Sequence, residues 1–317
     1  MPDKFLRMTR SMMPDAARPR PVMLAIGGDS ASGKTTLTRG LVEAIGPERC
    51  TAICVDDYHR HSREERRHLP FTPLHPDANY IDIMEQHLQM LAMGQPILKP
   101  VYDHATGTLA PPEYVQPRQF VIVEGLLPLF TKLSRACFDV NVFLDPPEQI
   151  RREWKLRRDT NDRGYTREQV LADLERREPE SAEFIRPQRR YADIVVRFAP
   201  AEGSAEVAGV PLSAELLLRP TIQHPPLAQI LSDDVADAMH LKIIRDDDGT
   251  PVDCLNVHGQ AEPEESQLLQ KEIWQNLADK RELPTGLGEV RPGQRSEPLA
   301  VTQLLLLYHL VQEVYQL

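Results

Sequence analysis

The sequence of 317 residues predicts an α/β fold: a mostly parallel sheet flanked by helices, followed by a C-terminal β-rich and helical extension. Short apolar runs that end in polar or glycine-rich turns alternate with helical stretches over the first 200 residues, which is typical of parallel strands joined by helices. After Pro200 the pattern changes to proline-rich spacers and β-like runs. We therefore expect one α/β domain and a different C-terminal region.

The individual elements follow from these patterns. Apolar runs that suit buried strands occupy residues 22–26, 51–55, 120–123, 140–144 and 194–198. Helical stretches lie between them, at residues 35–45, 81–93, 147–157 and 166–177. In the C-terminal region we expect a strand at 214–218, a hairpin from 240–244 and 254–257, helices at 262–283 and 301–315, and a Gly/Pro loop at 284–298.

The distribution of charge supports a division of the chain. The net charge is −10, and residues 201–317 carry 8 Lys/Arg against 19 Asp/Glu, so nearly all of the acidity lies in the C-terminal third. We expect a flexible tail at residues 1–21, an α/β domain at 22–200 and an acidic C-terminal subdomain at 201–317. Periodicity does not decide whether this last region is a subdomain or an oligomer contact.

Composition excludes several classes of protein. Hydrophobic residues make up 41% and charged residues 26% of the chain, which indicates a globular protein with no membrane span, since no apolar run approaches the roughly 20 residues that a spanning helix needs. The four cysteines and the absence of a signal-peptide pattern favour a reducing cytoplasm. The dense basic stretch at 151–190 is interleaved with carboxylates, so we expect no nucleic-acid partner.

A phosphate-binding loop follows the first predicted strand. Its residues are Gly28, Asp29, Ser30, Ala31, Ser32, Gly33, Lys34, Thr35 and Thr36, and they stand between a strand and a helix, as a nucleotide P-loop requires. We expect the loop amides to hold phosphate, Lys34 to reach the transferring phosphoryl group and Thr35 to ligate magnesium. The Asn-Lys-x-Asp segment of a GTPase is missing, and the short connection to the second strand favours a small-molecule kinase that uses ATP.

Carboxylates at two further strand ends complete the predicted site. Asp56 and Asp57 follow the second strand, where one of them could accept the proton of an acceptor hydroxyl, although both cannot be optimally placed. Glu124 ends the strand at 120–123 and could hold magnesium with Thr35. Arg63 adds a cation near the aspartates, which would suit an acceptor that carries a phosphate.

A basic segment after the fourth strand predicts a lid. Residues 154–159 and Arg163 place arginines where they could close over phosphates and exclude water. Taken alone, such a run is more often a solvated helix face. The histidines around His59 lack the ligand spacing of a zinc site, and Cys50 and Cys54 are expected to be core thiols.

The chain resembles the phosphoribulokinase and uridine kinase family, and looks most like the plant and cyanobacterial type of phosphoribulokinase. The matching segments lie within residues 22–198: 28–36, 54–59, 100–107, 123–126, 154–159 with 163–164, and 187–193. The resemblance implies ATP-dependent phosphorylation of ribulose 5-phosphate to the 1,5-bisphosphate, with Mg²⁺ and a possible homodimer. It also implies Asp56 as catalytic base with Asp57 in reserve, lid residues Lys155, Arg158 and Asp159, and substrate contacts from His59, Arg63, Tyr102, His104 and Arg163.

Three departures bear on what the resemblance implies. Ser32 replaces the regulatory cysteine that plant enzymes carry in the loop, so no thioredoxin-type switching is expected at Cys54. Leu127 stands where the family usually has His, and residues beyond Pro200 match only faintly. A kinase of the same fold that acts on uridine, glycerate or pantothenate therefore stays open, as does a catalytically quiet ATP-binding regulator whose acidic C-terminal third binds a partner protein.

Overall fold

The structure is a computed structural model that describes residues 20–200, 211–231, 238–277, 282–291 and 293–316. Nearly all of the predicted tail at 1–21 lies outside these ranges, as does the segment at 201–210 where the predicted domains meet. The division of the chain into domains stays a prediction. None of the described helices is long and apolar enough to cross a membrane.

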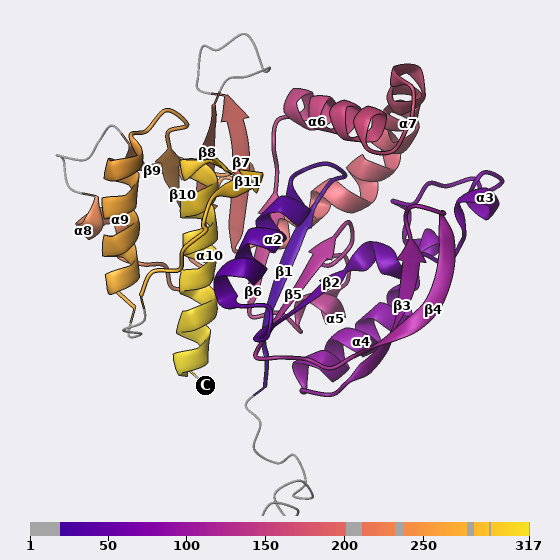
Figure 1. The fold of residues 1–317 in the computed structure, drawn as a ribbon, viewed down its shortest axis with the longest axis horizontal. Helices are drawn as coiled ribbons and strands as arrows, with labels where there is room; N and C mark the ends of the chain where they lie inside the picture. Colours follow the sequence, from indigo (N-terminus) through magenta and orange to yellow (C-terminus); the bar gives the residue numbers. More distant parts are fainter. Residues whose placement is uncertain (1–19, 201–210, 232–237, 278–281, 292, 317) are drawn as a thin grey trace, which may run out of the picture.

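One sheet of eight strands forms the centre of the molecule (Figure 1), in the order β2-β5-β1-β6-β7-β8-β10-β9. Its first five strands are parallel, as the sequence predicts. Each is apolar because both faces of the sheet are covered. Their bounds are Val22–Gly28 for β1, Cys50–Cys54 for β2, Phe120–Gly125 for β5, Val140–Leu144 for β6 and Ile194–Pro200 for β7.

The C-terminal strands continue this same sheet instead of forming another one. β8 pairs antiparallel with β7, and the hairpin of β9 and β10 adds to β8. Their bounds are Leu212–Leu218 for β8, Met239–Arg245 for β9 and Pro251–Val257 for β10. The arginine Arg219 reinforces this junction, because it bonds to the carbonyl oxygens of Arg189 and Ala192 and pairs with Asp246 in the hairpin turn.

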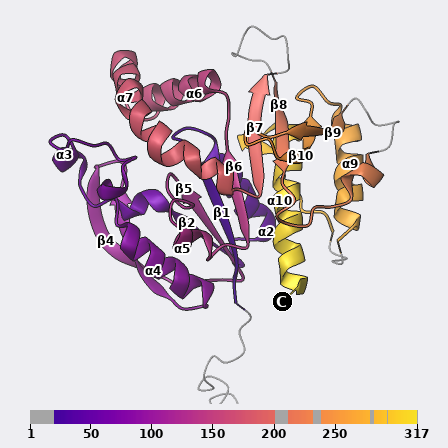
Figure 2. The same ribbon diagram turned by 180° about the vertical axis from the view of Figure 1, so that it is seen from behind.

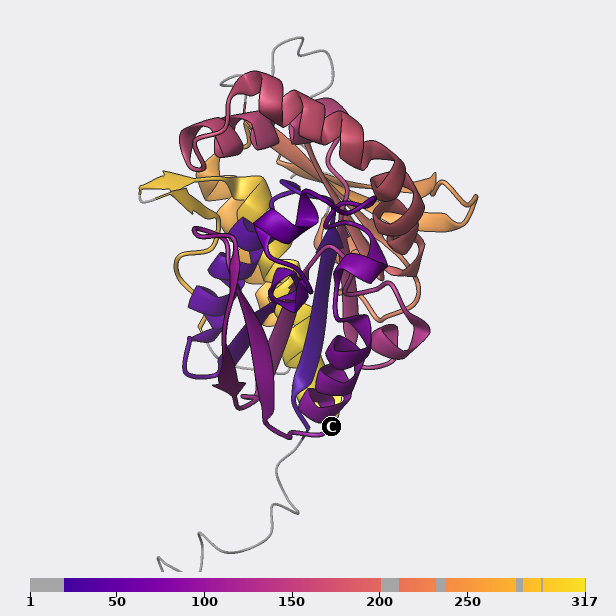
Figure 3. The same ribbon diagram turned by 90° about the vertical axis from the view of Figure 1, so that its right-hand side faces the viewer.

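Helices cover the two faces of the sheet (Figures 1 and 2). α2 (Lys34–Ile45), α9 (Pro263–Gln275) and α10 (Glu297–Gln316) bury apolar side chains on one face, and α4 (Ile81–Ala92) covers the other. α6 (Glu148–Asn161) and α7 (Arg167–Glu180) arch over the end of the sheet where the parallel strands finish (Figure 3). The shorter helices are α3 (Arg63–Arg66), α5 (Lys132–Arg135) and α8 (Leu227–Ile230).

A hairpin that the sequence patterns do not predict lies beside α4. β3 (Ile97–Asp103) and β4 (Thr108–Val115) form a separate two-stranded sheet. β4 has no buried residue, and three prolines interrupt the two strands, so the sequence lacks the sustained alternation that would predict a half-buried hairpin. A second small hairpin, β11 (Glu289–Arg291) and β12 (Gln294–Arg295), lies within the predicted loop at 284–298.

The C-terminal helices differ from their predicted bounds. α9 ends at Gln275, eight residues before the predicted end, and α10 begins at Glu297, four residues before its predicted start. α10 packs closely on α2: a Cβ added to Gly40 would lie 2.1 Å from Nε2 of Gln303. The helix that carries the phosphate loop is therefore supported by the C-terminal region.

The close packing of α10 predicts that this helix stabilises the whole chain. Replacing Leu305, which is fully buried, with Ala should lower the free energy of unfolding by about 3 kcal/mol, because a cavity forms. The matched control is Leu268→Ala on α9, where the side chain is 61% exposed and the change should stay within about 0.5 kcal/mol. Urea unfolding measures both, and equal small effects would show that α10 does not belong to the main core.

Candidate active site

The loop after β1 has the backbone of an anion-binding cradle. Gly28 and Gly33 both adopt positive φ angles, and Ala31 between them does so as well. A Cβ on Gly28 would lie 2.7 Å from Oγ of Ser32 and 2.8 Å from the carbonyl oxygen of Leu144, so only glycine fits. The loop leads into the N-terminus of α2, where free backbone N–H groups and the helix dipole favour a phosphate.

The side chain of Lys34 folds back over this loop. Its Nζ donates to the carbonyl oxygens of Gly28, at 3.0 Å, and of Asp29, at 2.7 Å. The side chain is buried, and no carboxylate in the described parts of the chain lies within ion-pair distance of it. The ammonium group thus has partial negative charges around it but no counter-ion, which suits a bound phosphate.

Thr35 and Glu124, the two predicted magnesium ligands, are hydrogen-bonded to each other. Oγ1 of Thr35 donates to Oε1 of Glu124 at 2.9 Å, and β5 places Glu124 directly beside Ile26 of β1. Burial raises the pKa of Glu124, and the negative charge of Asp56 adds to this, against the lowering effects of Lys34 and the Thr35 hydroxyl. A hydroxyl and a carboxylate oxygen at this distance are hard donors that could share a magnesium ion.

The two adjacent aspartates have different surroundings. Both lie in the 3₁₀ turn Val55–Tyr58 that follows β2. Oδ1 of Asp57 accepts from the backbone N–H of Tyr102 at 3.1 Å, and its Oδ2 pairs with Nζ of Lys99. The Asp56 carboxylate has no hydrogen bond or ion pair among the described residues. Asp57 is therefore bound to the β3–β4 hairpin, whereas Asp56 is available to a ligand.

Charged groups from several elements surround Asp56. Burial by itself would raise the pKa of Asp56, but the fields of His59, Lys34, His104 and Arg177 outweigh it and hold the pKa below its ordinary value. The carboxylate is consequently ionised at neutral pH.

The aromatic side chains of the predicted acceptor site stack on one another. The His59 and Tyr102 rings meet edge to face at 5.0 Å, and the Tyr102 and His104 rings at 5.1 Å. Nδ1 of His59 lies 2.7 Å from Oδ1 of Asn79, a partner that the sequence analysis missed. Burial lowers the pKa of both histidines, although Asp56 acts in the opposite direction.

Arg63 is held by the hairpin turn. Its backbone N–H donates to the carbonyl oxygen of Gly107 at 2.7 Å, and its Nη2 donates to that of His104 at 2.5 Å. A Cβ on Gly107 would lie 2.7 Å from Cβ of Arg63, so glycine permits this approach. Arg66, one turn further along α3, was also missed; it donates to the hydroxyl of Tyr102.

The predicted lid residues form one charge network. Nζ of Lys155 lies 2.7 Å from Asp159 and 3.2 Å from Asp173, while Nε of Arg158 donates to Asp159 at 2.8 Å. Arg163 lies 3.6 Å from the same carboxylate. Nη2 of Arg158 also reaches Oγ of Ser30 at 3.4 Å, so the lid contacts the phosphate loop.

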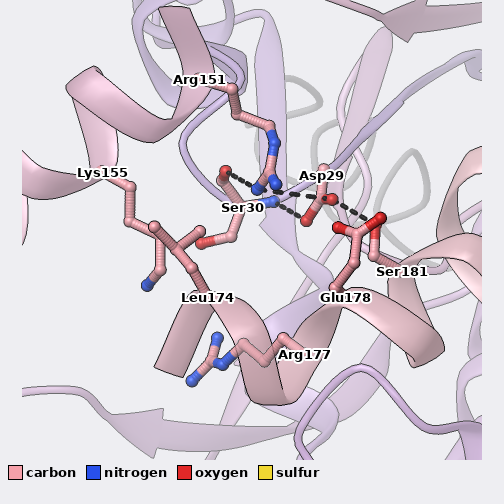
Figure 4. A pocket seen from close by; sticks show the side chains of 8 residues that line it. All are labelled: Asp29, Ser30, Arg151, Lys155, Leu174, Arg177, Glu178 and Ser181. Atoms are coloured by element: carbon pink, nitrogen blue, oxygen red, sulfur yellow. Dashed lines mark hydrogen bonds and ion pairs between the residues drawn. The ribbon is translucent and has the colours of Figure 1, made fainter. Parts of the chain in front are cut away.

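Figure 4 shows further contacts of the phosphate loop around Asp29, with Arg151 of α6 and with Ser181 just after α7. Oδ1 of Asp29 accepts from the N–H of Ser30, and Oδ2 accepts from the hydroxyl of Ser181 and lies 3.4 Å from Arg151. Ser181 begins a π-helical turn, Ser181–Ile185, directly after α7, which contains Pro179 in its last turn. No local sequence signal marks Ser181, because only the tertiary fold brings it to the loop.

Leu127, Thr36 and the cysteines, which the sequence also brought to attention, take no part in the contacts described above. Leu127 is buried in the apolar core on the α4 face of the sheet, and Thr36 lies in the first turn of α2. All four cysteines are free thiols. Burial raises the pKa of the Cys54 thiol well above its ordinary value, and the charge of Asp56 adds to this shift.

The chain is similar to several known proteins. The family model described as "Phosphoribulokinase / Uridine kinase family" matches residues 23–204. The chain is 42% identical over 181 residues to a phosphoribulokinase of Synechocystis sp., covering 57% of this chain and 54% of that protein. It is 34% identical over 183 residues to a uridine kinase of Chloroflexus aurantiacus, covering 55% of this chain and 86% of that protein.

Among solved structures, a phosphoribulokinase from Rhodobacter spheroides matches with a TM-score of 0.58 at 17% identity, over 81% of this chain and 98% of that one. This match confirms the predicted α/β fold. The chain spans about half the length of the curated phosphoribulokinases it matches.

The anchoring of the hairpin by Asp57 can be tested directly. Lys99→Met should lower the free energy of unfolding by about 3 kcal/mol and speed hydrogen exchange in residues 97–115, because Asp57 loses the partner of a largely buried ion pair. The matched control is Glu113→Gln. Its carboxylate is 3.7 Å from Lys99 but 63% exposed, so the change should stay within about 0.5 kcal/mol. Equal exchange rates in the two variants would contradict the anchoring role.

Proposed function

Because the chain belongs to the phosphoribulokinase/uridine kinase family, we propose that it is an ATP-dependent kinase that phosphorylates ribulose 5-phosphate to ribulose 1,5-bisphosphate. The observation that carries the proposal is the environment of Asp56. This carboxylate is ionised, free of hydrogen bonds within the described chain, and lies in the electrostatic field of Lys34 on the phosphate loop. A proton acceptor beside a phosphate cradle is what phosphoryl transfer to a hydroxyl requires.

The phosphate loop and Lys34 would bind ATP, the phosphoryl donor. The loop amides would bind the phosphates of ATP, and Lys34 would exchange its loop carbonyls for the oxygens of the transferring group. Arg158 already reaches Ser30 at the loop, so the lid would add positive charge over the phosphates and exclude water.

Thr35 and Glu124 fit a magnesium ion, since their side chains offer two hard oxygen ligands that lie 2.9 Å apart. We propose that these two residues hold the ion. When bound, magnesium would neutralise charge that develops on the phosphate oxygens.

On the acceptor side, Asp56 takes the proton from the attacking hydroxyl. The freed oxygen then bonds to the γ-phosphorus of ATP, and the bond from that phosphorus to the β-phosphate oxygen breaks, so that ADP leaves. His59, Tyr102 and His104 form one wall of this site, and Arg163 adds positive charge from the lid. Asp57 keeps the wall in place through Lys99 and Tyr102.

The relatives of the chain support a particular acceptor. The phosphoribulokinases of Synechocystis sp. and Triticum aestivum, at 42% and 32% identity, support ribulose 5-phosphate. A uridine kinase, 86% of whose length is matched, supports uridine as the second candidate. We also propose that the chain forms a homodimer and works in the cytoplasm. The four free thiols support the second of these two proposals, since a reducing compartment keeps cysteines unpaired.

The first test is ADP formation by the purified chain with MgATP and separate acceptors. We expect turnover with ribulose 5-phosphate, and little with uridine, glycerate, pantothenate or no acceptor. Removing magnesium with EDTA should abolish the signal. Turnover with uridine alone would move the substrate to the second candidate, and ATP binding without any turnover would favour the regulator.

The second test separates the two aspartates. Asp56→Asn should lower kcat by about 100- to 10 000-fold, because the proton acceptor is lost, with the KM for MgATP nearly unchanged. Asp57→Asn should instead raise the KM for the acceptor, because the hairpin that carries Tyr102 loosens. Steady-state kinetics of both variants measure this difference. An Asp56→Asn enzyme with wild-type turnover would remove Asp56 from the mechanism.

A further inference from the structure

Asp29 places a carboxylate inside the loop that is proposed to hold phosphates. Its side chain is only 9% exposed. Oδ1 accepts from the N–H of Ser30 at 2.6 Å, so the carboxylate helps to shape the loop backbone. The same carboxylate also repels the phosphates of a nucleotide, because like charges at close range raise each other's energy. A loop of this composition therefore needs a group that cancels the charge of Asp29.

Arg151 of α6 supplies the opposite charge (Figure 4). Its Nη1 lies 3.4 Å from Oδ2 of Asp29 and donates to the carbonyl oxygen of Ser30 at 3.3 Å. Its Nε and Nη2 both donate to Glu148 at 2.8 Å, which fixes the guanidinium on its own helix. Burial by itself would lower the pKa of Arg151, but the hydrogen bonds to Glu148 and the charge of Asp29 outweigh it and raise the pKa. Arg151 is therefore a buried, charged and well-positioned partner of the loop.

Ser181 reaches the same carboxylate from a different element. Its side chain is buried, and its hydroxyl donates to Oδ2 of Asp29. Ser181 is the first residue of the π-helical turn that follows α7, and irregular turns of this kind recur at functional sites. Asp29 is thus held by α6 on one side and by this turn on the other, neither of which belongs to the loop.

Two other basic side chains that line the same pocket are paired elsewhere. Arg177 pairs with Asp173 at 2.9 Å, and Lys155 pairs with Asp159 at 2.7 Å. In the described parts of the chain, Arg151 is the one cation within ion-pair distance of the loop carboxylate. Removing Arg151 would therefore leave a buried carboxylate without a counter-charge beside the phosphate site, which is unfavourable for the fold and for a bound anion.

We propose that Arg151 is a positioning residue that cancels the charge of Asp29, so that the phosphate loop can accept the polyphosphate of a nucleotide. Ser181 supports this role by holding the carboxylate in its orientation, in which Oδ1 fixes the N–H of Ser30. This inference rests on the proposed function and deepens it, because it explains how a loop that carries a carboxylate of its own binds a highly charged anion.

The test measures nucleotide binding, so that it does not depend on the acceptor. MgADP and MgATP are titrated calorimetrically into the full chain without an acceptor. Arg151→Met should weaken MgADP binding by about 30-fold, and MgATP binding by more, because ATP brings one more negative charge to the uncompensated Asp29. Combining Arg151→Met with Asp29→Asn should restore most of the affinity, since Asn keeps an oxygen for the N–H of Ser30 but carries no charge.

Three variants serve as controls. Arg152→Met makes the same change in charge at the next position of α6, where the side chain is 36% exposed and lies 3.8 Å from Glu148, and it should keep the wild-type affinities. Ser181→Ala removes a neutral donor, so it should weaken both nucleotides equally, by about 5-fold. Arg151→Lys keeps the charge and should retain part of the affinity. Thermal unfolding confirms that each variant is folded during the titrations.

Several results would overturn the inference. Unchanged MgADP binding by Arg151→Met would do so. A folded double variant that binds as weakly as Arg151→Met would do so as well, because Arg151 would then act through the Ser30 carbonyl oxygen or on the nucleotide itself. If Arg151→Met does not fold, the double variant, which lacks the uncompensated charge, still decides: near wild-type MgADP affinity supports the inference, and weak binding refutes it. A failed proposed function looks different, since the variants would change MgADP affinity as expected while the wild-type chain formed no ADP with ribulose 5-phosphate.

Discussion

The pairing of β5 between β2 and β1 is the constraint on which the site depends. In this register Glu124 stands directly between Ile26 of β1 and Cys54 of β2. The phosphate loop begins two residues after Ile26, and Asp56 comes two residues after Cys54. Because parallel strands end at the same edge of a sheet, the register of these strands brings together the cradle, the carboxylate that could hold magnesium and the candidate base.

Asp56 and Asp57 are adjacent in the sequence at this edge of the sheet, but they differ in their hydrogen bonds. Each oxygen of Asp57 has a hydrogen-bond partner, Lys99 for one and the N–H of Tyr102 for the other, and so Asp57 fixes the hairpin. Asp56 is left without hydrogen bonds from the described residues, although four basic side chains act on it. A carboxylate that is ionised but not hydrogen-bonded keeps its lone pairs for a ligand, whereas one that is fully bonded contributes rigidity.

Most of the sheet could be predicted from the sequence because its strands are buried on both faces, which leaves unbroken apolar runs. The β3–β4 hairpin could not, because β4 has no buried residue and Pro100, Pro111 and Pro112 break the pattern. The early start of α10 follows from a cap: Oγ of Ser296 accepts from the N–H of Leu299, and Pro298 suits a first turn. The partners Ser181 and Arg66 come from tertiary packing, which no local spacing encodes.

Charge balance connects the two halves of the proposed reaction. Lys34 and Arg66 are cations without carboxylate partners in the described chain, one at the phosphate loop and one at the acceptor wall, and Asp56 interacts with both. Positive charge around Asp56 keeps its pKa low, which makes it a weak base in the free protein. Phosphates bound at the loop would cancel part of that field and bring more negative charge, so the pKa of Asp56 would rise. The carboxylate would then accept a proton more readily when ATP is bound, which links proton transfer to occupancy of the phosphate loop.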